Sequence, residues 1–319
     1  MVRRFHGWAG LLLGLPITLL TLSGSGLVYR ESLERATSAP SARIDPRGRQ
    51  ALGLEETLTR VRGQNPGFRP TYIQIPPGAN APLEIVLTSG RETRFVAVDP
   101  FTGEVLGLLG GGAPSPIEPV RRLHANLLLG GAGRTVLGAL AILLVALGVS
   151  GIVLFLRHPR AWHARLGLAA AVPLLFAGVS GALLIWARVP SQPAPTTGAA
   201  PAVSLDQYAE AARGALPGAT LSWIAVGDPV TVRLRLPADW QRRGSNEVHL
   251  HPGTAEVLRV DRFADAPLAR KFFVAWTAIH YGEWGGALGR LLWAGAGAMT
   301  GLLWLTGSVL FFSQRAREG

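Results

Sequence analysis

Arg4-Phe5-His6-Gly7-Trp8 opens a long apolar stretch, and a related stretch opens with Ala161-Trp162-His163-Ala164-Arg165. The two stretches match at a constant offset of 157 residues, in the pairs His6/His163, Pro16/Pro173 and Ser23/Ser180. A constant offset across a whole stretch indicates an internal repeat. We therefore expect the fold to be built from two related halves.

Four stretches of the chain contain no Asp, Glu, Lys or Arg. Each is longer than the roughly 20 residues that a helix needs to cross a hydrocarbon core of ~30 Å. Buried helices of a soluble protein are the alternative, but these normally carry a polar face. The first stretch could also be a cleavable signal sequence, although its apolar run is longer than a signal core. We predict four transmembrane helices, over Phe5–Tyr29, Thr135–Leu156, Leu166–Ala187 and Leu291–Gln314.

The net charge of +11 comes almost wholly from arginine, because Lys271 is the only lysine. Many of these arginines flank the apolar stretches, which is typical of membrane anchoring and not of nucleic-acid binding. The N-terminus, residues 157–165 and the C-terminus carry Arg and almost no acid. The positive-inside rule therefore places both termini and the short middle loop in the cytoplasm, and two long loops outside.

The two long loops also match each other. Asp99-Pro100-Phe101-Thr102-Gly103-Glu104-Val105 corresponds to His251-Pro252-Gly253-Thr254-Ala255-Glu256-Val257 at an offset of 152, and His124 corresponds to His280 at an offset of 156. Both loops carry a short helical pattern and alternating strand patterns, such as Val230–Leu236. Each is expected to form a small α+β domain between two transmembrane helices.

The predicted fold is thus an α+β integral membrane protein, built as a tandem repeat of helix, outer domain and helix. Polar or Pro-rich linkers are expected over Glu31–Gln50 and Ser191–Pro201, and a Gly/Pro linker over Gly107–Pro119. The expected parts are helix 1 (1–30), outer domain 1 (31–119), helix 2 with its preceding segment (120–157), a short turn with helix 3 (158–188), outer domain 2 (189–270), and helix 4 with its flanks (271–319).

Four histidines fall into repeat-matched pairs: His6 with His163, and His124 with His280. Because the two halves have the same orientation, each pair should lie at one depth, the first near the cytoplasmic face and the second near the outer face. Two histidines from two helices at one level suit the axial ligation of a b-type haem in a bundle core. The sequence has no cysteine, which excludes iron–sulfur clusters and covalent c-type haem.

Other residues could take part in the same sites. Arg134 and Arg290 also match at an offset of 156 and could pair with haem propionates, although anchoring to lipid headgroups explains them equally well. The many glycines of the spans would admit a flat macrocycle or simply allow close helix packing. His249 and His251 should face one side of a strand, where a small metal site is possible, whereas a turn position is the simpler explanation for His251.

The repeated Asp99–Val105 turn, with the His-Gly-Trp and Leu-His segments, resembles the PepSY-associated transmembrane family over nearly the whole chain. The family consists of bacterial inner-membrane proteins with periplasmic PepSY domains, and some members look like di-haem reductases of ferric siderophores. The resemblance implies two haem b groups held by His6, His163, His124 and His280. The second turn departs from the family pattern, because His251 and Ala255 stand where Asp and Gly are preferred.

Three functions are compatible with the sequence. In the first, electrons from a quinol or a separate reductase cross the bilayer and reduce a periplasmic ferric siderophore or other ferric chelate, which releases the iron. The second is a non-enzymatic membrane-anchored regulator, for example of a protease, which needs no matched histidines. The third is a small transporter, but its spans should then carry ionisable residues at mid-depth, and these are almost absent.

Overall fold

The computed structural model describes residues 1–37, 44, 46, 48–76, 78, 81–108, 117–187 and 193–318. The chain divides into two compact units. The helical unit comprises Met1–Leu33, Pro116–Arg188 and Trp276–Gly319, and the sheet unit comprises Glu34–Ser115 and Val189–Ala275. The predicted boundary at 188/189 and most of the predicted linker over 107–119 lie outside the described residues.

Within the described residues, four helices are long and apolar enough to cross a membrane, which confirms the predicted number of spans. Two shorter helices, α4 and α8, end just before the second and fourth of these spans and carry His124 and His280. The bounds are α1 (Val2–Leu27), α4 (Ile117–Asn126), α5 (Gly130–Arg157), α6 (Trp162–Trp186), α8 (Leu268–His280) and α9 (Gly286–Glu318).

The long helices pack in pairs, α5 with α6 and α1 with α9, and contacts of α1 with α5 and of α6 with α9 join the pairs. Small residues permit the close approach that holds membrane helices together. A Cβ added at Gly178 of α6 would lie 2.8 Å from the backbone oxygen of Ala141 in α5. At the chain ends, the rings of Trp8 and Phe311 are 5.0 Å apart, so the two termini lie at the same end of this unit.

One segment differs from its prediction. The first residues of the predicted polar linker over Glu31–Gln50 form a helix, α2 (Arg30–Thr37), directly after α1. Its sequence, RESLERAT, combines good helix formers with neither Gly nor Pro, so local propensity favours a helix there despite the polarity.

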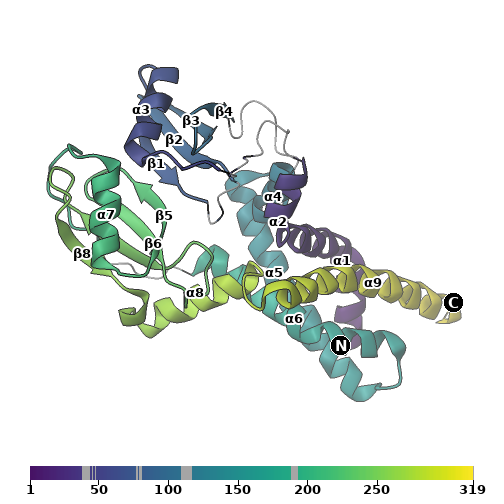
Figure 1. Cartoon of the computed structure of the whole chain (residues 1–319). Helices are drawn as coiled ribbons and strands as arrows, with labels where there is room; N and C mark the ends of the chain where they lie inside the picture. The colour runs from purple at the N-terminus through teal and green to yellow at the C-terminus, as the bar shows by residue number, and fades with distance from the viewer. Residues whose placement is uncertain are drawn as a thin grey trace. The chain divides into compact units, whose positions relative to one another are not determined.

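The sheet unit contains eight antiparallel strands in the order β4-β3-β2-β1-β5-β6-β7-β8 (Figure 1). Both predicted outer segments contribute to this one sheet, because β1 of the first pairs with β5 of the second. The strands are β1 (Arg69–Gln74), β2 (Leu83–Ser89), β3 (Glu92–Val98), β4 (Val105–Leu108), β5 (Thr220–Ala225), β6 (Val230–Arg235), β7 (Asn246–Leu250) and β8 (Val257–Asp261).

Two helices, α3 (Leu54–Gln64) and α7 (Leu205–Ala215), lie on one face of this sheet (Figure 1). Their apolar residues form a single core with the inward residues of the strands, including Leu58, Val61, Tyr208, Ile224 and Val248, all at most 1% exposed. The alternating pattern of β6 follows from this arrangement, because only one face of the strand meets the helices.

Candidate functional site

The first histidine pair, His6 and His163, lies where four helices of the helical unit meet. His6 belongs to α1 and His163 to α6, and their ring centres are 6.4 Å apart. The Nδ1 atom of His6 lies 2.8 Å from Oγ of Ser150 in α5, and Nδ1 of His163 lies 2.8 Å from Oγ1 of Thr306 in α9. Each ring is therefore fixed by a hydroxyl group from a neighbouring helix.

The second histidine pair, His124 and His280, has almost the same ring spacing. Its ring centres are 6.3 Å apart. The Nδ1 atom of His280, in α8, lies 2.7 Å from Oγ of Ser180 in α6. The Nδ1 atom of His124, in α4, lies 3.0 Å from the backbone oxygen of Leu20 and 3.3 Å from Oγ of Ser23, both in α1. Short helices before the second and fourth spans thus place their histidines against the first and third spans.

The two pairs lie near opposite ends of the spans. At about 1.5 Å of rise per helical residue, His6 and Leu20 are roughly 21 Å apart along α1, and His163 and Ser180 are roughly 25 Å apart along α6. Leu20 contacts His124 and Ser180 contacts His280, so these lengths separate the first pair from the second. The separation approaches the ~30 Å thickness of a hydrocarbon core.

The ring spacing within each pair is close to that of two imidazoles bound to one metal ion. With a metal–nitrogen bond of about 2.0 Å and about 1.1 Å from ring nitrogen to ring centre, two such imidazoles have centres at most about 6.2 Å apart. The observed values are 6.4 and 6.3 Å. In the part of the chain that the structure describes, no hydrogen bond uses Nε2 of these four histidines, so these atoms are free to coordinate.

Glycines leave room beside the first pair. Gly10 and Gly167 follow His6 and His163 by one helical turn and therefore lie on the same helix faces. A Cβ added at Gly10 would meet nothing within 4 Å, and one at Gly167 would meet a single atom at 3.9 Å. Gly151 and Gly307 instead lie against the rings, where an added Cβ would be 3.3 Å from the Cε1 atoms of His6 and His163. The donor set and this open space fit a flat macrocycle.

Residues 3–315 match the family model of the PepSY-associated TM region. The chain belongs to this family. The match covers nearly the whole chain, so both halves and all four paired histidines fall within it. No curated protein matches the chain.

Arg134 and Arg290 lie near the N-terminal ends of α5 and α9, each as the fifth residue of its helix, in this PepSY-associated TM protein. Arg134 is exposed and Arg290 half-buried. Among the described residues, neither guanidinium group forms a hydrogen bond or an ion pair. Both groups are therefore available for carboxylates or lipid phosphates, and the structure places neither in contact with a histidine of the two pairs.

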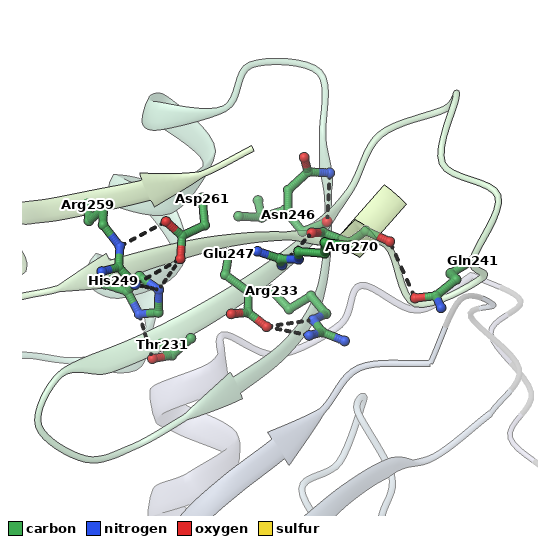
Figure 2. Close-up of polar contacts among 11 residues, drawn as sticks. Thr231, Arg233, Gln241, Asn246, Glu247, His249, Arg259, Asp261 and Arg270 are labelled. Carbon is green, nitrogen blue, oxygen red and sulfur yellow. Dashed lines mark hydrogen bonds and ion pairs between the residues drawn. The ribbon is translucent and has the colours of Figure 1, made fainter. Parts of the chain in front are cut away.

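A second cluster of potential ligands lies in the sheet unit, where Glu247, His249 and Asp261 bring their donor atoms within 4.8 Å of one another (Figure 2). Arginines already pair with both acids: Arg233 with Glu247, and Arg259 with Asp261 at 2.8 Å. Two guanidinium groups would repel a divalent cation, so charge argues against a metal ion here.

Both ring nitrogens of His249 have hydrogen-bond partners within this cluster. Its Nδ1 atom lies 3.1 Å from Oγ1 of Thr231, and its Nε2 atom lies 3.0 Å from Oδ2 of Asp261. Burial alone would raise the pKa of Asp261, but hydrogen bonds from His249 and Arg259 outweigh it and hold that pKa below its ordinary value. The cluster is thus a polar network on the sheet.

The prediction that His249 and His251 face the same side of a strand is wrong. The strand β7 ends at Leu250, so His251 lies in the following turn, where its Nδ1 accepts a hydrogen bond from the backbone N–H of Gly253 at 3.1 Å. The simpler expectation of a turn position for His251 is confirmed.

The sequence did not single out Ser150 and Thr306, the two residues whose hydroxyl groups contact the first histidine pair. They match at an offset of 156 residues, as His124 and His280 do, but the two residue types differ. A comparison that pairs serine with threonine at the repeat offset would have found them.

Proposed function

We propose that this protein is a di-haem oxidoreductase of the bacterial inner membrane, which passes electrons across the bilayer to reduce a periplasmic ferric siderophore or another ferric chelate. The observation that carries the proposal is the pair of histidine sites, each with ring centres close to the spacing of two imidazoles bound to one metal ion and with free Nε2 atoms. A membrane-anchored binding module would need neither site.

The four paired histidines would hold two haem b groups, one with His6 and His163 and one with His124 and His280. Bound haem iron supplies reversible one-electron transfer. Arg134 and Arg290 would receive the propionates through charge-assisted hydrogen bonds, since both guanidinium groups lack another partner among the described residues. The hydroxyl groups of Ser150, Thr306 and Ser180 hold three of the imidazole rings in place, and the Leu20 carbonyl holds that of His124.

The position of the two pairs supports transfer across the membrane. The roughly 21–25 Å between them along α1 and α6 divides a ~30 Å core into shorter steps. Electrons would enter at the cytoplasmic or quinone side, from a quinol or a separate reductase, because the sequence has no G-x-G-x-x-G motif after a strand for a dinucleotide.

The outer side is where the ferric chelate would be reduced. One electron from the donor converts Fe³⁺ to Fe²⁺, and the donor loses that electron. Fe²⁺ has a lower charge and binds hard oxygen ligands more weakly, so reduction releases iron from an oxygen-donor chelate. The sheet unit is the part of the chain that would meet this substrate.

We further propose that the sheet unit consists of two PepSY-like domains and that the chain is a tandem repeat. Each half contributes one helix and four strands to the sheet, in the order α3, β1–β4 and α7, β5–β8. The strand order is symmetrical about the β1–β5 junction. These observations support a duplication, with both halves in the periplasm and both termini in the cytoplasm.

Optical spectroscopy of the detergent-purified protein tests the proposal. Oxidised and dithionite-reduced spectra, with haem quantified per chain, should show a six-coordinate b-type band and two haems. His280→Ala should remove one haem and spare the other, because it deletes a ligand of the second pair only. His251→Ala, at a turn position outside both pairs, is the matched control and should keep both.

Activity is then measured in liposomes with quinol as the donor, a ferric chelate outside and a chromogenic ferrous chelator as the reporter. His280→Ala should abolish the ferrous signal, and His251→Ala should retain it. A colourless wild-type protein from cells supplied with haem would refute the redox mechanism and favour a membrane-anchored binding module.

A further inference from the structure

A hydroxyl group lies within 2.8 Å of Nδ1 in three of the four paired histidines, His6, His163 and His280. Ser150, Ser180 and Thr306 are at most 8% exposed, so water does not compete for their hydrogen bonds. Each hydroxyl also lies within reach of a backbone carbonyl on the preceding turn of its own helix: 3.0 Å for Ser150 to Leu147, 2.6 Å for Ser180 to Phe176, and 3.2 Å for Thr306 to Leu303.

A hydroxyl has one proton to donate and lone pairs to accept. If that proton goes to the backbone carbonyl, the oxygen can only accept from the histidine, which must then carry its proton on Nδ1. This arrangement makes two hydrogen bonds through each hydroxyl. With the proton on Nε2, the hydroxyl would have to abandon its carbonyl in a region without water, so the Nδ1–H form is favoured.

His124 provides independent support, because its nearer partner is a carbonyl. The backbone oxygen of Leu20 lies 3.0 Å from Nδ1 of His124 and can only accept. This ring must therefore carry its proton on Nδ1 and present a lone pair at Nε2. Ser23 lies farther away, at 3.3 Å, and donates its own proton to the same carbonyl at 2.8 Å.

We infer that Ser150, Thr306 and Ser180 are positioning residues that hold His6, His163 and His280 as the Nδ1–H tautomer and tune the metal through them. Ser23, the repeat counterpart of Ser180, has no such role, because the Leu20 carbonyl serves His124. The inference rests on the proposed function for its effect on haem, whereas the tautomer itself is a property of the chain alone.

The effect on haem follows from ligand basicity. A histidine that donates from Nδ1 is a more basic ligand and stabilises the ferric state. Removing the acceptor in Ser180→Ala should therefore raise the reduction potential of the second-pair haem only. We expect its ferric–ferrous equilibrium to change up to about tenfold, which is 59 mV for one electron. Ser150→Ala and Thr306→Ala should raise the potential of the first-pair haem.

Redox titration of these variants, followed optically, gives the first test. Ser23→Ala is the matched control for Ser180→Ala. Ser308→Ala is the control for Thr306→Ala, because among the described residues the Ser308 hydroxyl bonds only to the backbone oxygen of Trp304 in the same helix. Both controls should leave both potentials unchanged. The conservative changes Ser150→Thr and Thr306→Ser should keep the wild-type potential of the first-pair haem. Each introduces the hydroxyl residue that stands at the matching position of the other half. Equal shifts in Ser23→Ala and Ser180→Ala would overturn the inference.

Nitrogen NMR of the haem-free protein with ¹⁵N-labelled histidine gives the second test. The wild type should show His280 as the Nδ1–H tautomer, and Ser180→Ala should mix the two tautomers. A wild-type His280 protonated on Nε2 would overturn the inference even if haem binds. Conversely, a wild type that binds no haem would refute the proposed function and leave this spectrum as the test of the tautomer.

Discussion

At the scale of single residues, Asp261 links the ends of two strands, because it pairs with Arg259 beside it and with His249 on the neighbouring strand β7. Its pKa is lower in the folded state than in the unfolded chain. A carboxyl group of this kind stabilises the fold above its unfolded pKa of about 3.9, and the contribution disappears as the pH falls through the lower folded pKa.

Asp261→Asn should therefore lower the thermal unfolding midpoint at neutral pH, by an amount that corresponds to about 1 kcal/mol. The difference from the wild type should shrink below about pH 4, where the unfolded carboxyl takes up its proton. Asp265→Asn, at an exposed carboxylate four residues later, is the control. Thermal melts of the detergent-solubilised wild type and variants across a range of pH measure the difference in unfolding midpoint. A difference that persists unchanged at the lowest pH would contradict the stabilising role of the Asp261 carboxylate.

The candidate site itself was predictable at this scale only where the two halves share identical residues. The paired histidines stand out because the same residue recurs at a fixed offset. Ser150 did not stand out, because its partner His6 is 144 residues away and the contact depends on how α1 packs against α5. The repeat locates equivalent positions, but it does not indicate which of them touch.

At the scale of elements, α3 and α7 cap each other. The N-cap residue of α3 is Gly53, which has no side chain to accept hydrogen bonds from the first turn. Asp206 of α7 does so instead, accepting from the backbone N–H groups of Leu54 at 2.8 Å and Glu55 at 3.1 Å. In return, the Glu55 carboxylate accepts from the N–H of Leu205 at 2.9 Å. Carboxylates at both helix starts also complement the helix dipoles.

Asp206→Ala should destabilise the protein by about 1 kcal/mol, the usual cost of losing an N-cap acceptor. Glu210→Ala is the matched control, because it removes an exposed carboxylate from the same helix without touching a cap. Chemical denaturation followed by tryptophan fluorescence compares the two variants. Equal stability of both variants would contradict the cross-cap, as would a larger loss in Glu210→Ala.

Elements with a strong periodic signal were predicted well, and the others were not. The four membrane spans follow from uninterrupted apolar sequence, and the helix at Leu54–Gln64 follows from its apolar spacing. The strands β5 and β8 were not predicted, whereas β7 was expected as the strand that carries His249. In β5, Trp223 interrupts the alternation, and its ring lies under the guanidinium group of Arg233 on the neighbouring strand, which is a tertiary effect.

At the scale of the whole molecule, the sequence predicts two outer segments but not their union in one sheet. Pairing of β1 with β5 joins residues about 150 positions apart, through only three matched residue pairs. Hydrophobic periodicity describes which face of a strand is buried and carries no information about which edge it pairs with. The shared core of α3 and α7 follows from that pairing.

The proposed topology has both termini in the cytoplasm and the sheet unit outside. The contact between Trp8 and Phe311 places the two termini at one end of the helical unit, and arginines such as Arg4 and Arg315 flank that end. Arginine is retained on the cytoplasmic side of inner-membrane proteins. Electron transfer from inside to outside requires this orientation, since the second histidine pair must then face the periplasm.

Single cysteines can test this orientation directly, because the natural sequence contains none. Arg91→Cys lies in the turn between β2 and β3 and should react with a membrane-impermeant maleimide in cells whose outer membrane has been permeabilised. Ser313→Cys, near the end of α9, should react only after the inner membrane is opened as well. The unmodified protein controls for background labelling. The reverse pattern would place the sheet unit in the cytoplasm, and electrons would then have to travel inward to reach a chelate there.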